Sequence, residues 1–188
     1  SRYDGFRFRD YPLIMSIDSL SVPLHQAVKT LKEAPDGLYY ALLYQGGMTC
    51  FDKEIEKYLP VRFDRPLKLK EIHDFCWYDG NLYLATSQGL FESHPIRKKE
   101  GKDDFVLCTL NPEPLIKGKV ANLCTDGKTN LYFSVDREKV MHYDFVTKKS
   151  ALIREYNVVN RLFLRQGYLW ICRLWNDIVC YDLKTHKE

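Results

Sequence analysis

A short motif that occurs four times in this 188-residue chain constrains its fold more than any other feature. Each copy has a glycine-containing turn followed by a leucine, an aromatic residue, a large apolar residue and a small residue. The leucines are Leu38, Leu82, Leu131 and Leu169, at intervals of 44, 49 and 38 residues. Strand-like repeats with a period of about 40–50 residues are typical of β-propellers, in which each repeat is one four-stranded blade.

Each copy is the second strand of a blade, and the sequence around it supplies the other three. The four strands of a blade are called a, b, c and d in chain order. An apolar run precedes the Asp-Gly or Gln-Gly turn, a third strand follows, and a more polar strand comes last, as expected for an outermost strand facing solvent. The third strand is closed by Asp52, Asp144 or Asp182, and by His94 in the second copy. The sequence therefore predicts an all-β fold, a single partial propeller domain over residues 1–188. Its blades cover approximately residues 1–11 (strand d only), 27–63, 71–110, 119–156 and 158–182.

Composition excludes several classes of function. The 28 Lys and Arg against 25 Asp and Glu give a net charge of +3 spread along the chain, so we expect no nucleic-acid partner. No apolar run approaches the roughly 18 residues of a membrane-spanning helix, and the first residues lack the apolar region of a signal peptide. We expect no direct insertion into a membrane.

The cysteines are predicted to be buried free thiols, because each lies in an apolar, strand-like run. They are Cys50, Cys76, Cys108, Cys124, Cys172 and Cys180. Three disulfides remain the alternative for this even number. The absence of a Cys-x-x-Cys pair argues against a metal site, and no cofactor is expected.

No catalytic motif stands out, so we expect no enzymatic activity. His73 and Asp74 lie in an inner-strand run and are interpreted as packed or hydrogen-bonded residues rather than as a general base with its carboxylate. The charged run at residues 97–102 is interpreted as a solvated loop, as is the pair Lys148 and Lys149 in the third blade.

Three stretches carry a resemblance to a known family. They are Val-x-x-Leu-x-x-x-x-Asp-Gly-Leu-Tyr at 28–39, Asp-Gly-Asn-Leu-Tyr-Leu-Ala-Thr-Ser-Gln-Gly-Leu-Phe at 79–91, and Ser-Arg-Tyr-Asp-Gly-Phe-Arg-Phe at 1–8. Together they resemble the two-component regulator propeller repeat of the periplasmic sensor region of hybrid two-component histidine kinases. The second copy is the most similar, with Tyr83 for the usual Trp and Ala85 for the usual Gly. The third departs most, because Lys128 and Thr129 are inserted in its turn.

The resemblance implies an open arc, or fragment, of a seven-bladed propeller in the periplasm. Without it, closure into a four-bladed ring by the N-terminal strand is equally compatible with the repeats. It also implies a parent receptor with a histidine kinase downstream, and partners that include the remaining blades of the parent chain. A homodimer is a further possibility, since a second copy would cover the terminal blades.

Ligand recognition is expected at one face of the propeller, where the loops between strands b and c meet those between strands d and a. A carbohydrate site needs aromatic faces and amide, carboxylate or guanidinium groups. The candidate ligand-binding residues are Tyr44, Gln45, Ser87, Gln88, Asp136, Arg137, Arg173, Trp175 and Asn176. Alternatively, Tyr44 and Trp175 only cover the ends of the blades.

These features predict a non-enzymatic sensor module that binds an oligosaccharide or other small polar ligand and signals to a histidine kinase. A propeller that serves as a protein-interaction or dimerisation scaffold is the alternative. A propeller hydrolase or lyase is the least supported hypothesis, because converging acids or a metal site are not recognisable in the sequence.

Overall fold

The structure is a computed structural model that describes residues 27–44, 47–65, 71–101, 103–175 and 177–188. Residue 103 and four short strands within residues 1–26 are described by their backbone only. These four strands are β1 (Arg2–Tyr3), β2 (Phe8–Arg9), β3 (Ile14–Ile17) and β4 (Leu20–Pro23), and they form two antiparallel pairs, β1 with β2 and β3 with β4. The sequence did not predict the β3–β4 hairpin.

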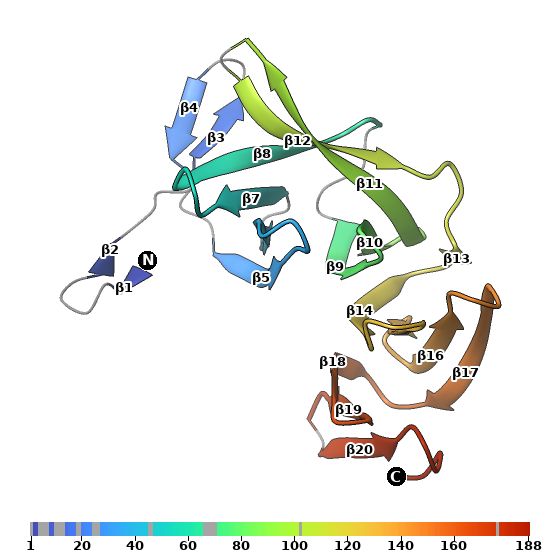
Figure 1. The fold of residues 1–188 in the computed structure, drawn as a ribbon. Coiled ribbons are helices and arrows are strands. Elements are labelled where there is room, and N and C mark those ends of the chain that lie inside the picture. The colour runs from blue at the N-terminus through green and yellow to red at the C-terminus, as the bar shows by residue number, and fades with distance from the viewer. Residues whose placement is uncertain are drawn as a thin grey trace. The chain divides into compact units, whose positions relative to one another are not determined.

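All regular elements within the described ranges are β-strands, which confirms the predicted all-β class and its propeller blades (Figure 1). The chain divides into two compact units. One comprises Ser1–Lys70 and Pro95–Cys108, and the other comprises Glu71–His94 and Thr109–Glu188. Each unit is described by itself below.

The first unit contains a four-stranded antiparallel sheet in the order of the sequence. Its strands are β5 (Val28–Glu33), β6 (Tyr39–Leu43), β7 (Met48–Asp52) and β8 (Lys57–Phe63). Tyr40, Leu42 and Cys50 are fully buried, because both faces of strands β6 and β7 carry apolar side chains. This sheet spans residues 28–63.

An aspartate ends the third strand of a blade because its carboxylate holds the turn that follows. Asp52 Oδ1 accepts hydrogen bonds from the backbone N–H groups of Glu54 (2.9 Å) and Ile55 (3.4 Å). The turn returns the chain to pair Asp52 with Lys57, and the same five-residue step pairs Asp144 with Lys149 and Asp182 with Lys187. Side chains of Asp favour such turns because they accept bonds from backbone groups two or three residues on.

The second repeat lacks this aspartate, and its third strand does not turn. His94 and Pro95 take its place, so β11 (Gly89–Glu100) continues for twelve residues, where the corresponding strands in the other blades have five or six. β12 (Asp103–Leu110) then returns (Figure 1). We call the segment Pro95–Cys108 the arm; it belongs to the first compact unit.

The arm pairs in parallel with β8, in the register Val106 to Val61 and Cys108 to Phe63. Phe105, Val106 and Cys108 are buried there. Two predictions are therefore wrong in part: β8 is not an outermost edge, because the arm pairs with it, and residues 97–100 form part of a strand rather than a loop, although their side chains are exposed as expected. Residues 97–100 extend the strand, because no aspartate turn ends it at residue 94.

Arg97 fastens the arm to the first sheet. Its guanidinium donates from Nη1 to Asp52 Oδ2 (2.7 Å), from Nη2 to Asp104 Oδ2 (2.6 Å) and from Nε to Asp104 Oδ1 (3.0 Å). The hydrogen bonds from Arg97 lower the pKa of Asp104. Burial raises the pKa of Asp52, but the N–H groups of Glu54 and Ile55 and the bond from Arg97 outweigh burial and lower it.

Replacing Arg97 with methionine is expected to loosen the arm, because the Asp52 carboxylate is buried and would lose its cationic partner. The guanidinium itself is half exposed, so we expect a loss of about 1 kcal/mol, or about fivefold lower hydrogen-exchange protection of the arm amides. In the wild-type protein, Asp52 and Asp104 have lowered pKa values, so their contribution to stability is lost only when acid protonates them. The attachment of the arm should therefore weaken as the pH falls below about 4. Unchanged exchange in Arg97→Met at neutral pH would contradict this account.

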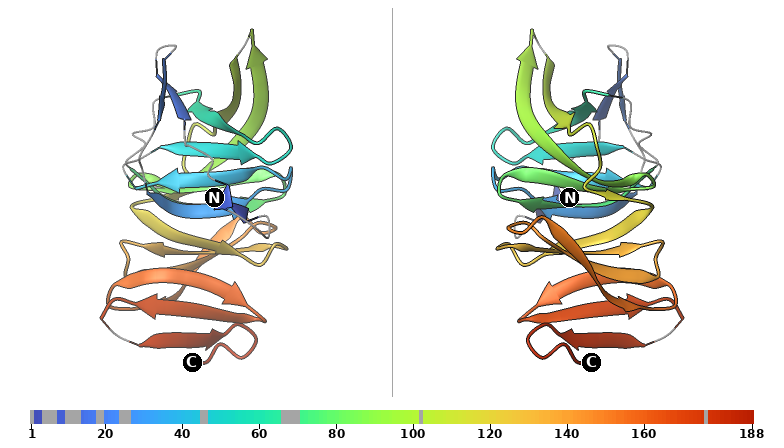
Figure 2. Two further views of the ribbon diagram at one scale, coloured as in Figure 1. Left: turned by 90° about the vertical axis from the view of Figure 1, so that its left-hand side faces the viewer. Right: turned by 90° about the vertical axis from the view of Figure 1, so that its right-hand side faces the viewer.

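The second unit begins with β9 (Ile72–Tyr78) and β10 (Asn81–Thr86), which pair antiparallel with each other, and β10 pairs with the first half of β11. A short strand, β13 (Ile116–Lys117), also pairs with β11. A complete blade follows, with β14 (Val120–Thr125), β15 (Asn130–Val135), β16 (Lys139–Asp144) and β17 (Lys149–Glu155) in order. The last sheet has three strands, β18 (Val159–Arg165), β19 (Tyr168–Arg173) and β20 (Ile178–Asp182). In both views of Figure 2, the strands of this last sheet, coloured orange to red, lie side by side in chain order.

Two apolar clusters hold the sheets of the second unit together. The first joins Tyr83 and Leu90 to Leu131 and Phe133, and the second joins Tyr132 and Val140 to Leu162, Leu169 and Ile171. Within the second unit, Tyr83 and Tyr132 therefore face the following sheet, while Leu131 and Leu169 face the preceding one. This alternation explains why strand b is apolar on both faces.

All six cysteines are free thiols, in agreement with the prediction. Cys50, Cys76 and Cys108 are buried, and Cys124, Cys172 and Cys180 are half-buried. Burial raises the pKa of the Cys50 thiol to about 12, so this residue is a packing residue rather than a nucleophile.

Candidate functional site

One backbone hydrogen bond recurs in every blade and joins its b–c loop to the residue before strand a. In all four sheets, the N–H of the first loop residue donates to the carbonyl of the residue before strand a at 2.8–3.0 Å. The pairs are Tyr44 to Ala27, Ser87 to Glu71, Asp136 to Lys119 and Leu174 to Val158. The b–c loop and the loop that leads into strand a therefore lie together at one edge of each sheet, where the sequence predicts ligand contacts.

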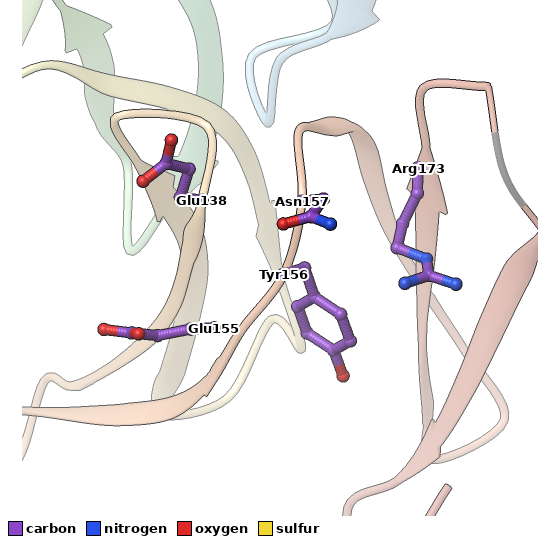
Figure 3. A pocket seen from close by; sticks show the side chains of 5 residues that line it. All are labelled: Glu138, Glu155, Tyr156, Asn157 and Arg173. Atoms are coloured by element: carbon purple, nitrogen blue, oxygen red, sulfur yellow. The ribbon is translucent and has the colours of Figure 1, made fainter.

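A hollow of about 390 Å³ opens at this edge in the second unit, between the blade of β14–β17 and the sheet of β18–β20. It is lined by Glu138, Glu155, Tyr156, Asn157 and Arg173. Figure 3 shows Tyr156 and Asn157 in the middle, the two glutamates on one side and Arg173 on the other. Each of the five lining side chains carries a polar group, which suits a ligand with several hydrogen-bonding groups.

Tyr156 is the fixed centre of the hollow. Its hydroxyl donates to Glu188 Oε1 (2.7 Å), and its backbone N–H donates to the carbonyl of Glu138 (2.8 Å). Glu188 also forms an ion pair with Arg154 (2.5 Å). Burial raises the pKa of Tyr156, and the bond to Glu188 raises it further, so the phenol stays protonated and its ring has one orientation.

Arg173 borders the hollow at the end of β19. One of its terminal nitrogens, Nη2, donates to Asp177 Oδ1, while its Nε is buried and has no acceptor among the described residues. Its guanidinium carbon lies 6.0 Å from the centre of the Tyr156 ring. The Arg173 bond lowers the pKa of Asp177. Arg173 therefore has a donor with no partner beside the hollow.

Trp175 follows Arg173 by two residues and is 92% exposed. Its backbone has a φ of 63°, an uncommon conformation for a large residue, so the loop holds it outward without packing contacts for the indole. A tryptophan that covered the end of a blade would be buried. The structure therefore does not support the capping role that the sequence left open for Trp175.

The structure places the other predicted residues in three different ways. Asp136 and Arg137 form the turn directly before Glu138, both with positive φ, and thus adjoin the hollow. Ser87 and Gln88 are bonded to their own blade, Ser87 Oγ to His73 Nε2 (2.9 Å) and Gln88 Nε2 to Glu71 Oε2 (3.2 Å). Tyr44 is exposed and lies in the first unit. Gln45 and Asn176 lie outside the described residues.

Four residues of the hollow were missed by sequence reasoning: Glu138, Glu155, Tyr156 and Asn157. Asn157 belongs to a d–a loop, the second kind of loop expected to converge there, and Tyr156 was assigned to the end of strand d. A search of both loop types for polar and aromatic side chains finds Tyr156 and Asn157. Glu155 is the last residue of a strand and gives no such signal.

The described ranges contain no cluster of three or more side chains that could hold a metal ion. None of the described elements is a helix long and apolar enough to cross a membrane.

No family model matches the chain, and no curated protein matches it. Solved structures are similar in fold. An auxiliary nutrient binding protein from Bacteroides thetaiotaomicron has a TM-score of 0.62 at 18% identity over 85% of this chain. The extracellular domain BT3049 of B. thetaiotaomicron, assigned to a hybrid two component system, has a TM-score of 0.59 at 13% identity over 94%. The WD40 domain of Neurospora crassa Pan2 has a TM-score of 0.56 at 10% identity over 86%.

This chain corresponds to 40%, 26% and 48% of those three proteins respectively, less than two thirds of each. At these identities the similarity shows the propeller fold alone.

Proposed function

We propose that this chain is part of a non-enzymatic, ligand-sensing propeller, and that its second unit binds an oligosaccharide in the hollow that Arg173 borders. Trp175, two residues after Arg173, would supply an aromatic contact to the same ligand. The setting we propose is the periplasmic region of a hybrid two-component sensor, which passes the binding signal to a histidine kinase. The motifs at residues 28–39 and 79–91 support this setting, as do two structural neighbours, one named as a nutrient binding protein and one as the extracellular domain of a hybrid two component system.

The observation that carries the proposal is the combination of groups at one edge. Glu138, Glu155 and Asn157 offer acceptors and donors for hydroxyl groups, and Trp175 offers an exposed aromatic face. Sugars present hydroxyl edges and apolar C–H faces, and proteins bind them with this pairing of polar and aromatic side chains.

Titration calorimetry of the protein with a panel of oligosaccharides tests the proposal. Binding of one class of glycan, lost in Asn157→Ala, would support it. No heat with any glycan, together with dimerisation that depends on protein concentration, would contradict it and favour the scaffold. Turnover of a glycan would contradict the non-enzymatic part.

Replacing Trp175 with alanine is expected to weaken glycan binding about tenfold, because an aromatic contact contributes about 0.5–1.5 kcal/mol beyond buried area. The stability of the protein should not change, since the indole is almost fully exposed. Calorimetry and thermal unfolding measure the two quantities.

Tyr168→Ala is the matched control for this prediction. Tyr168 is a half-exposed aromatic residue at the opposite end of the same strand, β19, and its removal should leave glycan affinity unchanged. Equal losses in both variants would show that the site is not at Trp175.

One observation favours the scaffold as a second candidate. The Phe163 and Trp170 rings stack at 6.0 Å on the face of the last sheet, and Phe163 is 41% exposed. The aromatic residues that correspond to Trp170 in the two preceding sheets, Tyr83 and Tyr132, are buried by the following sheet. A protein partner at this face would give it the same burial.

A further inference from the structure

We propose that Arg173 binds a carboxylate of the ligand, and that Asp177 occupies the place of that carboxylate in the structure seen here. The inference rests on the proposed function, because it takes the hollow to be the ligand site, and it narrows the ligand to an acidic sugar with a single carboxylate.

The first argument is the incomplete use of the Arg173 guanidinium. Nε–H and the neighbouring Nη2–H of arginine point the same way and match the two oxygens of one carboxylate. Here Nη2 donates to Asp177 Oδ1, but Nε has no acceptor and is buried. A donor buried without a partner lowers stability, and a carboxylate with a second oxygen in reach would remove that cost.

The second argument is that Asp177 is weakly held. Its side chain is 70% exposed, and its carboxylate accepts hydrogen bonds from Arg173 and from its own backbone N–H, with no other strand or loop contributing a described donor. An exposed pair of this kind contributes little stability, so a ligand can displace Asp177 at low cost. By contrast, Arg97 uses Nε together with Nη2 on Asp104 and is a complete fork.

The third argument is the distribution of charge along the hollow. Figure 3 shows Glu138 and Glu155 on the side opposite Arg173, with Tyr156 between. Lys139 lies 3.9 Å from Glu155, but no partner is described for the Glu138 carboxylate. A second acidic group on the ligand would meet these carboxylates, whereas hydroxyl groups would donate to them. The hollow therefore suits one carboxylate at the arginine and hydroxyl groups beyond it.

The experiment compares three ligands of equal length: a disaccharide with one terminal glucuronic acid, its methyl ester, and the neutral glucose analogue. We expect the acid to bind at least about tenfold more tightly than the ester, as a charge-assisted bidentate contact would give. In Arg173→Gln this preference should vanish while binding of the neutral disaccharide persists. In Asp177→Asn the acid should bind a few-fold more tightly and the neutral sugar as before.

A carboxyl titration by NMR gives a readout independent of affinity. Asp177 has a pKa below its ordinary value because Arg173 donates to it, so a bound acid that displaces Asp177 should raise that pKa back toward its ordinary value. An unchanged Asp177 pKa in the saturated complex, or equal affinities for acid and ester, would overturn the inference. Asp177→Asn alters only an exposed side chain, so its result stands even if Arg173→Gln does not fold.

The two proposals fail in different ways. If all three sugars bind alike, sugar binding stands and the carboxylate inference is wrong. If none binds, the proposed function fails and the inference with it. If glycolate alone binds as tightly as the acidic disaccharide, the carboxylate site stands and the sugar is wrong.

Discussion

Replacing Asp74 with alanine is expected to lower the free energy of unfolding by about 2–4 kcal/mol. Asp74 is buried in β9, and both oxygens of its carboxylate accept backbone N–H groups at 2.8 Å, Oδ1 from Phe75 and Oδ2 from Leu123. Leu123 belongs to β14, so this one side chain joins the inner strands of two successive sheets. Alanine would leave the two donors buried without an acceptor.

A local backbone irregularity lies directly before Leu123, whose N–H donates to Asp74. The pairing of β14 with β15 skips Asn122, which has a φ of 55° and forms a bulge. Residues at a bulge leave the ladder of backbone hydrogen bonds. The Asp74 carboxylate therefore contacts β14 directly beside this bulge.

Urea unfolding and the exchange rate of the Leu123 amide measure the effect. Asp144→Ala is the matched control, because its carboxylate also accepts two backbone N–H groups, those of Val146 and Thr147, but in an exposed turn. Water can replace the Asp144 carboxylate, so we expect a much smaller loss of stability in Asp144→Ala than in Asp74→Ala. Equal losses in the two variants would refute the bridging role of Asp74.

Replacing Gly89 with alanine is expected to lower the free energy of unfolding by about 3 kcal/mol. Gly89 begins β11 with a φ of 153°. A methyl group there would lie 2.3 Å from the carbonyl oxygen of Ile116 and 2.7 Å from Cβ of Pro114. Both contacts involve backbone or a rigid ring, so the β11–β13 pairing would have to open.

Gly80→Ala separates the steric clash from the cost of the backbone angle. Gly80 also has a positive φ, 74°, but nothing lies within 4 Å of the position of its added methyl group. We expect about 1 kcal/mol for this variant, the cost of a left-handed conformation alone. Thermal and urea unfolding of both variants give the comparison, and a Gly89→Ala protein as stable as Gly80→Ala would show that the β13 segment moves aside easily.

The strands of the blades could be predicted from local sequence because their signals are local. The alternation around Leu131 and the glycine turn at Gly127 specify β15 and its entry without any distant contact. The arm could not be predicted, since a polar run such as residues 97–101 is equally suited to a loop and to a strand. The partners of the arm decide that it forms strands: Asp52 binds Arg97 from forty-five residues away, and β8 pairs with β12.

The candidate site was only partly predictable for the same reason. Arg173 and the turn at Asp136 were selected by position in the blade, and the structure places both at the hollow or beside it. Ser87 and Gln88 hold equivalent positions but are bonded to His73 and Glu71. The repeat predicts equivalent positions for all four b–c loops. It does not predict which loop side chains are hydrogen-bonded within their own blade and which are available to a ligand.

The amino-acid sequence by itself therefore determined the strand content, the blade period and the edge at which loops converge, because turns and apolar alternation act between near neighbours. Tertiary structure alone decided the path of the arm, the Asp74 bridge and the Tyr156–Arg173 hollow. Each of these joins groups from separate strands or loops, and the energy of a buried charge or donor depends on which distant atom meets it.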